Sequence, residues 1–352
     1  MKIIAELGTC DGKLDYAIHA AVRAAQAGAW AVKVQMYHPD RLFAPWAERY
    51  DRLGGKQKLQ VEDAPAPIAY DQWEKVKKVC DDLGVEFFAS VWDEEAIDAC
   101  EAMDVRFYKI GSADITHQPL IEKVASMNKG IFLSTGASEL AEVERALGWI
   151  ADAYPSKKMN LILLACTLSY PTELADANLS RIAALATAFP GIAVGYSDHT
   201  TTLHAPWVAA SLGAPVLERH FSVTPGAGGD HNMAANFEQL KQICELGDAV
   251  PTVLGPFPPK FEPIPAELAA RDKARRSIVT AVDIKQGTPL TVAMLKFQRP
   301  GDGIPPYQLT SIVGGKVGET EFKQQRATVD IPAGTQLRAE WYGLTYGSLT
   351  VE

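Results

Sequence analysis

The chain has 352 residues, 47% of them hydrophobic, and its 43 acidic residues outnumber its 34 lysines and arginines, which gives a formal net charge of −9 at pH 7. A chain of this length and apolar content can bury a sizeable core, and we expect one large domain and one small one. The acidic balance excludes a general nucleic-acid binder, because neutralising phosphates requires a basic surface.

The five cysteines indicate neither a disulfide framework nor a structural zinc site. Their number is odd, and they form no Cys-x-x-Cys pair or other zinc-type spacing, which fits a reducing cytosol. The first residues enter a predicted strand without the pattern of a signal peptide, and no apolar run reaches membrane-spanning length. We therefore expect a soluble, cytoplasmic protein that binds neither nucleic acid nor a membrane.

Apolar runs, each predicted as a buried strand, alternate along the chain with helical patterns. The runs lie near residues 2–8, 30–35, 86–91, 106–111, 131–135, 161–166, 192–197 and 215–220. Between the first two, residues 14–27 show helical periodicity that stops at Gly28, a typical helix C-terminus. Eight such repeats over about 250 residues predict the α/β class and a (β/α)₈ TIM barrel. A doubly wound sheet is the rival, but no Gly-x-Gly-x-x-Gly follows the first run.

Two segments that contain prolines differ from this alternation of strands and helices. Residues 45–68 are charged and read as a long loop after the second strand, on the rim where loops often cover a site. After Val250 six prolines crowd a short segment that cannot continue a helix, so we predict a linker over residues 251–271. The barrel would then span residues 1–250, and a small β-rich domain and tail would span residues 272–352.

Polar residues stand at the carboxyl ends of several predicted strands. They occur in the runs Ala31-Val-Lys33-Val-Gln35, Tyr108-Lys109-Ile-Gly-Ser112, Gly195-Tyr-Ser197-Asp198-His199 and Glu218-Arg-His220. In a barrel these ends share one mouth, where catalysis concentrates. Lysines within apolar strands suggest a bound phosphate, and two histidines about twenty residues apart suggest a metal. The alternatives without a functional role are lysines that extend to solvent and histidines that are only structural.

Ten short motifs in order along the chain resemble the sialic acid synthase family. They are Ile4-Ala-Glu6-Leu-Gly8, Val32-Lys33-Val-Gln35, Tyr108-Lys109-Ile-Gly-Ser112, Leu133-Ser134-Thr-Gly136, Cys166-Thr167 with Tyr170-Pro171-Thr172, Gly195-Tyr-Ser197-Asp198-His199-Thr200, Glu218-Arg-His220-Phe221, Gly229-Asp230, Arg275-Arg276-Ser277 and Gln298-Arg299-Pro300-Gly301-Asp-Gly303. The last two resemble the family's small antifreeze-like (SAF) domain. The resemblance covers nearly the whole chain.

The resemblance implies an enzyme that condenses phosphoenolpyruvate with an N-acyl hexosamine, most simply N-acetylmannosamine, to a nine-carbon 2-keto acid, with release of phosphate. It implies a domain-swapped homodimer in which the small domain covers the partner's barrel mouth. Phosphoenolpyruvate would be held by Lys33, Lys109, Ser112, Ser134 and Ser197, with Ser90 as a further substrate-binding residue. Glu6, Gln35, Tyr170, Asp230 and Arg299 would face the sugar. His199 and His220 would bind a divalent metal, Mn²⁺ or Mg²⁺, and Glu6 or Asp230 would activate the attacking water.

Some positions depart from the family's pattern. Cys10, Val91, Ala165 and Leu168 stand where other residues are usual, which leaves the choice of sugar open. His231 could be a further ligand or base, although a solvated loop histidine is the simpler interpretation. The functional alternatives are a legionaminic or pseudaminic acid synthase, a pyruvate aldolase on the same barrel, and a non-catalytic carbohydrate-binding relic.

Overall fold

The computed structural model divides into two compact units, Met1–Pro256 and Phe257–Glu352. It describes residues 1–8, 10–44, 67–156, 158–227, 229–255, 260–317 and 320–342. Most of the predicted loop after the second strand, residues 45–66, lies outside the described residues. In the part of the chain that the structure describes, no helix has the length and apolar character needed to cross a membrane.

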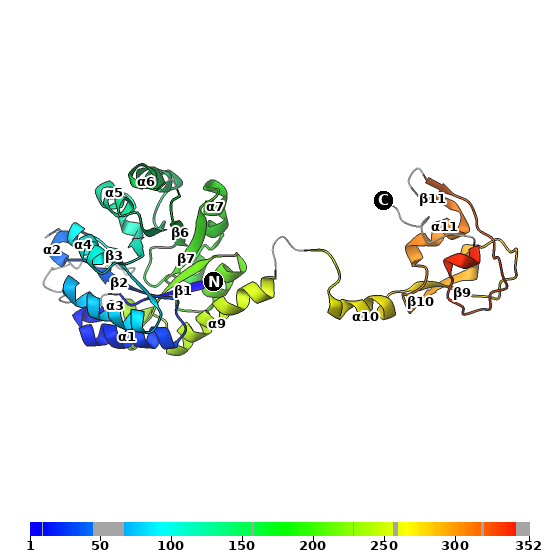
Figure 1. Cartoon of the computed structure of the whole chain (residues 1–352), viewed down its shortest axis with the longest axis horizontal. Coiled ribbons are helices and arrows are strands. Elements are labelled where there is room, and N and C mark those ends of the chain that lie inside the picture. Colours follow the sequence, from blue (N-terminus) through cyan, green and yellow to red (C-terminus); the bar gives the residue numbers. More distant parts are fainter. Residues whose placement is uncertain are drawn as a thin grey trace. The chain divides into compact units, whose positions relative to one another are not determined.

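The first unit is a closed barrel of parallel strands, drawn from blue to green in Figure 1. Its strands are β1 (Lys2–Glu6), β2 (Ala31–Met36), β3 (Glu86–Val91), β4 (Phe107–Ile110), β5 (Gly130–Ser134), β6 (Leu161–Cys166), β7 (Ala193–Asp198) and β8 (Val216–His220). Neighbours in sequence pair in parallel, and β8 closes the barrel on β1, with Glu6 opposite His220. The predicted TIM barrel is confirmed, and the doubly wound alternative is wrong.

Helices surround the barrel (Figure 1). They are α1 (Leu14–Gln26), α2 (Pro39–Leu42), α3 (Trp73–Asp82), α4 (Glu94–Ala102), α5 (Gln118–Ser126), α6 (Leu140–Ala153), α7 (Ser180–Ala188), α8 (His204–Ser211) and α9 (Phe237–Leu254). The main core lies between these helices and the outer face of the strands. Helix α1 buries a stripe of alanines, from Ala17 to Ala24, and small side chains let the helix lie close to the strands.

A second apolar cluster fills the lower part of the barrel interior. It consists of Ile4, Ala31, Phe88, Phe132, Leu164 and Val216. Phe88 and Phe132 stack with their ring centroids 5.2 Å apart. This floor closes the barrel below, so polar residues that follow on the same strand face can meet only above it.

Helix α9 passes through Pro251 to Leu254, so the expectation that the prolines end the helix before residue 251 is wrong at this position. Proline cannot donate a hydrogen bond to the carbonyl four residues earlier, which here belongs to Gly247. That carbonyl instead accepts a 2.6 Å hydrogen bond from the amino group of Met1. The backbone group that the proline leaves free is therefore satisfied. Helix α10 (Pro265–Ala274) also falls within the predicted linker.

The second unit is small and contains short strands. They are β9 (Ser277–Thr280), β10 (Leu295–Gln298), β11 (Gly315–Val317) and β12 (Thr320–Phe322), accompanied by helix α11 (Leu309–Val313). Strands β9 and β10 pair antiparallel, and so do β11 and β12. Ile284 and Ile331 exchange two backbone hydrogen bonds of 2.8 Å, which joins two segments that are 47 residues apart in the sequence. The unit has its own core, built around Ile278, Leu290 and Ile312.

Candidate active site

Strand alternation explains how the polar residues reach the barrel mouth. Side chains two residues apart share a strand face, so the residues two positions after the floor also point into the barrel. Ile4 is followed in this way by Glu6, and Phe88 by Ser90. The same step gives Lys33, Ser134, Cys166 and Glu218 on their own strands. A layer of buried polar residues therefore lies directly above an apolar floor.

Lys33 lies at the centre of this layer and bridges two carboxylates. Its Nζ is 2.6 Å from Oε2 of Glu6 and 3.5 Å from Oε2 of Glu218, and it donates a 2.8 Å hydrogen bond to Ser90. Burial opposes its charge, but the two carboxylates outweigh burial and raise the pKa of Lys33. Burial likewise opposes ionisation of Glu218, yet Lys33 and Lys109 lower the pKa of Glu218 to about 2. The cluster is charged at neutral pH.

Glu6 and Glu218 are held in different ways. Oε1 of Glu6 accepts hydrogen bonds from Nε2 of Gln35 at 2.8 Å and from the backbone of Gly8 at 3.1 Å. Oε1 of Glu218 accepts a 2.8 Å hydrogen bond from Ser197. Oε2 of Glu218 has no hydrogen-bond partner among the described residues, and only the longer Lys33 contact faces it. That oxygen can therefore accept a proton or a hydrogen bond from a bound molecule.

Lys109, by contrast, is a buried cation without a carboxylate partner in the described part of the chain. Its Nζ donates to the carbonyl oxygen of Ile110 at 3.0 Å, and burial lowers the pKa of Lys109. The buried hydroxyl of Ser134, on the next strand, makes no hydrogen bond to the described residues. A buried ammonium without an ion-pair partner and a buried hydroxyl without a hydrogen bond are groups that a bound anion would satisfy.

Ser112 stands beside this cation, in the turn that follows β4. Its Oγ contacts Sγ of Cys166 at 3.0 Å and accepts a 3.0 Å hydrogen bond from the backbone of Gly136. A Cβ at Gly136 would lie 2.7 Å from that sulfur and 2.8 Å from that hydroxyl, so only glycine fits there. Burial raises the pKa of the Cys166 thiol, which keeps it protonated.

His199 and His220 lie beside the acidic cluster, with ring centroids 5.6 Å apart. Nδ1 of His199 hydrogen-bonds the carbonyl oxygen of Thr167 at 2.8 Å, so Nδ1 carries the proton and Nε2 keeps its lone pair. Burial and the neighbouring His220 lower the pKa of His199 to about 3, so the ring is neutral at pH 7. The ring of Tyr170 lies 4.3 Å from that of His199 and 6.0 Å from that of His220.

These two imidazoles fit a divalent metal as a pair of nitrogen ligands. The Thr167 carbonyl fixes the tautomer that metal coordination requires. Among the described residues no group of three His, Cys, Asp or Glu side chains could hold a metal ion. The described residues would thus supply two ligands, and water and substrate could take other positions on the ion.

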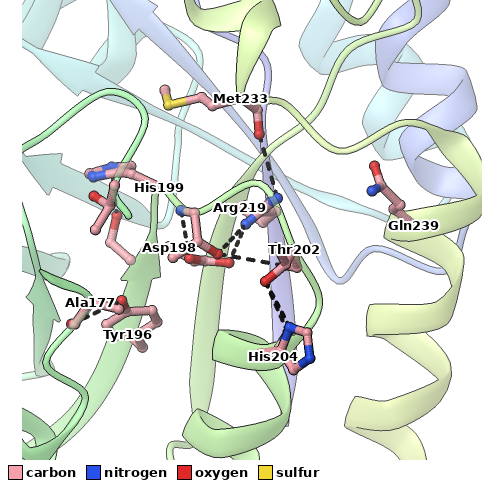
Figure 2. A network of polar contacts seen from close by, with 12 residues as sticks. Ala177, Tyr196, Asp198, His199, Thr202, His204, Arg219, Met233 and Gln239 are labelled. Carbon is pink, nitrogen blue, oxygen red and sulfur yellow. Dashed lines mark hydrogen bonds and ion pairs between the residues drawn. The ribbon is translucent and has the colours of Figure 1, made fainter. Parts of the chain in front are cut away.

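Behind the two histidines, Asp198 and Arg219 form a buried ion pair on the outer face of β7 and β8. Arg219 also reaches Oγ1 of Thr200 at 3.4 Å and the carbonyl oxygen of Met233 at 3.5 Å. Figure 2 shows Arg219 between Asp198 and the Met233 carbonyl, with the His199 side chain pointing away from the pair. The pair therefore joins β7, β8 and the segment after β8 directly behind the histidines.

The structure brings most of the predicted site residues together above the floor. Glu6, Lys33, Gln35, Ser90, Lys109, Ser112, Ser134, Tyr170, Ser197, His199 and His220 all occupy or follow the carboxyl ends of strands. Arg299 belongs to the second unit and is exposed. Asp230 falls in the turn Gly229–Asn232, and its side chain lies outside what the structure describes.

His231 is not the solvated loop histidine that the sequence favoured. It is buried, its Nδ1 contacts Ser222 at 2.9 Å and its Nε2 contacts Asp11 at 3.2 Å. Because both ring nitrogens have partners, His231 is not a metal ligand in this arrangement.

Sequence reasoning missed Glu218, Cys166 and the Asp198–Arg219 pair. Glu218 stood in a highlighted run but was given no role. The alternation of side chains between the two faces of a strand could have revealed it. Glu218 precedes His220 by two residues and must therefore share its face. Arg219, between them, must face outward, and a charge there requires a buried partner.

Comparisons with known proteins agree with this geometry. Residues 20–257 match the NeuB family, and residues 275–340 match the SAF domain. The chain is 32% identical to the N,N'-diacetyllegionaminic acid synthase of Legionella pneumophila over 351 residues, which cover 95% of this chain and 92% of that protein. It is 30% identical to the human N-acetylneuraminate-9-phosphate synthase over 327 residues, which cover 90% of this chain and 88% of that protein.

A solved structure is also similar. It is that of the N-acetylneuraminic acid synthetase from Leptospira borgpetersenii in complex with citrate. The TM-score is 0.66 at 29% identity, and the match covers 76% of this chain and 89% of that one.

Proposed function

The chain belongs to the NeuB family and is an enzyme of the sialic acid synthase type, and from this premise we propose that it condenses phosphoenolpyruvate with an N-acyl hexosamine. The product is a nine-carbon 2-keto sugar acid, and inorganic phosphate is released. The observation that carries the proposal is the buried ammonium of Lys109 without a carboxylate partner, beside the unpartnered hydroxyl of Ser134. Five buried free thiols support a reducing, cytosolic compartment.

Phosphoenolpyruvate carries a phosphate and a carboxylate, and the layer above the floor offers cations and hydroxyls for both. Lys109, Ser112 and Ser134 are the donors on one side of the layer, and Lys33, Ser90 and Ser197 are those on the other. Lys33 lies within 4 Å of two carboxylates, whereas no carboxylate of the described residues forms an ion pair with Lys109. We therefore assign the larger share of the substrate's negative charge to Lys109.

The reaction forms one carbon–carbon bond and one carbon–oxygen bond, to water, and breaks the carbon–oxygen bond to phosphate, while the aldehyde oxygen takes up a proton and becomes a hydroxyl. Carbon 3 of the enol phosphate attacks the acceptor's aldehyde carbon, and positive character develops at carbon 2. Water adds to carbon 2 and loses a proton, and phosphate leaves from that carbon. Glu6 and Glu218 are carboxyl groups of the described site that could accept this proton, and Oε2 of Glu218 is the one that lies farther from Lys33, at 3.5 Å against 2.6 Å. Asp230 stays a candidate from the sequence.

The acceptor is assigned to the histidine side of the site. The ring of Tyr170 lies beside that of His199, tilted by 37°, and Gln35 donates a hydrogen bond to Glu6, so a sugar there would meet an aromatic ring, an amide and a carboxylate. A divalent ion on His199 and His220, Mn²⁺ or Mg²⁺, would polarise the acceptor's aldehyde oxygen. We take N-acetylmannosamine as the first acceptor to test, and precursors of legionaminic and pseudaminic acid as the alternatives.

A screen of hexosamine acceptors with phosphoenolpyruvate tests this function. Mass spectrometry of the products should show an acceptor lengthened by a three-carbon acid unit, with one phosphate released for each product molecule. A panel that includes N-acetylmannosamine and 2,4-diacetamido sugars separates the neuraminic from the legionaminic and pseudaminic alternatives. Absence of phosphate release with every acceptor would contradict the proposal.

The two lysines should behave differently when their charge is removed. Lys109→Met should weaken phosphoenolpyruvate binding about ten- to a hundredfold, because a charged hydrogen bond is lost, and should leave stability unchanged. Lys33→Met should weaken binding similarly and also cost about 1–3 kcal/mol of stability, because Glu6 and Glu218 lose their shared cation. Calorimetric titration and urea unfolding measure both effects, with the exposed Lys78→Met as control. Equal stability of the two variants would contradict the assignment.

One observation favours a second function, a pyruvate aldolase. Burial lowers the pKa of Lys109, and a lysine with a lowered pKa can form a Schiff base with a carbonyl substrate. Such an enzyme would act on pyruvate and release no phosphate. Covalent trapping of Lys109 by pyruvate and borohydride would support the aldolase, and phosphate release without trapping would support the synthase.

We propose, further, that Arg299 contacts the acceptor bound in the barrel of a partner subunit. This rests on the family resemblance of the motif that contains Arg299 and on the exposure of that residue. Mixing Arg299→Ala protein, which should keep only a small fraction of the activity, with inactive His199→Ala protein should restore part of the activity, since a mixed dimer combines one intact barrel with one intact arginine. The measurement is phosphate release after proven subunit exchange. No recovery would mean that Arg299 acts within its own chain or not at all.

A further inference from the structure

We propose that Ser277 is a positioning residue that holds the turn formed by residues 299–303 in the shape that presents Arg299 to the acceptor sugar. The inference rests on the proposed contact of Arg299 with the acceptor. All the groups that hold this turn lie within the second unit, and they give an exposed arginine a defined position. Without such support, a long side chain on a surface turn would lose conformational entropy on binding and bind more weakly.

The hydroxyl of Ser277 is fully buried, and every hydrogen-bonding position it has is used on or beside this turn. It donates to the carbonyl oxygen of Pro300 at 2.7 Å and accepts from the backbone of Gly303 at 3.0 Å. It also accepts a 2.8 Å hydrogen bond from Nε2 of Gln336. One side chain therefore joins the two ends of the turn that begins with Arg299.

Gln336 also holds the turn at residues 299–303. Its Nε2 also donates to Oδ1 of Asp302 at 2.8 Å, on the exposed side of the turn. A Cβ at Gly303 would lie 2.4 Å from the Gln336 side chain, so the amide packs directly on the turn. Strand pairing places Gln298, the last residue of β10, opposite Ser277. The turn that follows β10 therefore begins next to Ser277.

Helix α10 closes the other side of the turn. The backbone of Gly301 donates a 2.6 Å hydrogen bond to the carbonyl oxygen of Asp272. A Cβ at Gly301 would lie 2.4 Å from Cβ of Arg275, so the two segments approach more closely than any other residue at this position allows. Arg299 is thus the exposed end of a turn that is fixed on three sides, by β9, Gln336 and α10.

Strand β9 provides a matched control three residues further on. Thr280 is equally buried, donates to the carbonyl oxygen of Pro332 at 2.6 Å and accepts from the backbone of Thr335 at 2.9 Å. It does for the turn at residues 332–335 what Ser277 does for the turn at residues 299–303. Removing its hydroxyl tests the cost of losing such bonds while the side chains of Ser277 and Gln336 both stay in place.

The experiment compares Ser277→Ala, Gln336→Ala, Thr280→Val and Arg299→Ala in the full-length protein. Ser277→Ala should raise the KM for the acceptor about three- to tenfold and leave the KM for phosphoenolpyruvate unchanged. Thr280→Val should change neither KM, at a similar loss of stability. In the Arg299→Ala background, Ser277→Ala should add nothing to the acceptor KM, because the group it positions is gone. Amide exchange at Gly303 should be faster in Ser277→Ala and unchanged in Thr280→Val.

The outcomes separate this proposal from the one it rests on. An acceptor KM that rises in Arg299→Ala but not in Ser277→Ala or Gln336→Ala overturns the positioning role and leaves the contact of Arg299 in place. Equal effects of Ser277→Ala and Thr280→Val also overturn it, since they would reflect stability alone. An acceptor KM unchanged in Arg299→Ala overturns the contact itself, and the role of Ser277 with it. Should Ser277→Ala fail to fold, Gln336→Ala decides, because that side chain is only half-buried.

Discussion

Replacing His199 or His220 by glutamine should lower turnover by about a thousandfold or more while the barrel stays folded. The two rings supply the pair of imidazole nitrogens at the barrel mouth that would bind the divalent ion. Polarisation of an aldehyde oxygen by such an ion is worth several kcal/mol in the transition state. Both side chains follow strand ends above the apolar floor, so the core packing beneath them is untouched. Phosphate release and the melting temperature measure the two effects.

The control is His204→Gln. This histidine is exposed, only five residues beyond His199, and contacts Thr202 at 3.2 Å outside the site. Its replacement should change neither activity nor binding of Mn²⁺, whereas either site variant should lose Mn²⁺ binding, measured directly by calorimetry. Chelator-treated wild-type protein should likewise be inactive and recover with Mn²⁺ or Mg²⁺. Full activity after chelation, with no response to either ion, would contradict the role given to the two histidines.

The sequence predicts the barrel well because its strands are buried on both faces. Such strands appear as continuous apolar runs, and each run near the expected position became a strand that pairs with its neighbour. In helix α1 the hydrophobic pattern predicts the buried face less well. The periodicity gives Ala17, Ile18, Ala21, Val22 and Ala25 as apolar positions, and of these only Ala17 and Ala21 are fully buried. The buried stripe is made of alanines, because closeness to the strands matters more than hydrophobicity.

The site was predictable where a charge interrupts an apolar run, as at Lys33 and Lys109. What the sequence did not reveal was how these charges are paired. Lys33 bridges Glu6 and Glu218, which belong to strands more than 200 residues apart in the sequence and become neighbours only when β8 closes on β1. His231 illustrates the same limit, since its partner Asp11 lies in the loop after β1. Long-range closure of the barrel, rather than local propensity, sets these contacts.

Arg219→Met should destabilise the barrel by about 3–5 kcal/mol, because it leaves the carboxylate of Asp198 buried without its cation. Both side chains are only 1% exposed, so water cannot replace the lost partner. The same substitution removes the contacts of Arg219 with Thr200 and with the carbonyl oxygen of Met233. Urea unfolding followed by tryptophan fluorescence measures the loss. Because the pair stands directly behind His199 and His220, turnover should fall as well.

Two further variants separate the burial of an unpaired charge from the loss of an attraction. Asp198→Asn combined with Arg219→Met removes both charges, and the double variant should recover part of the stability that Arg219→Met loses. Lys78→Met breaks an ion pair with Asp82 in which the side chains are 75% and 65% exposed, and it should cost less than about 1 kcal/mol. A loss in Arg219→Met no larger than that in Lys78→Met would contradict the role given to the buried pair, since that pair would then contribute no more than an exposed one. A double variant less stable than Arg219→Met would show instead that the carboxylate of Asp198 stabilises the strands through its other contacts, such as the hydrogen bond that it accepts from the backbone of Thr200 at 2.9 Å.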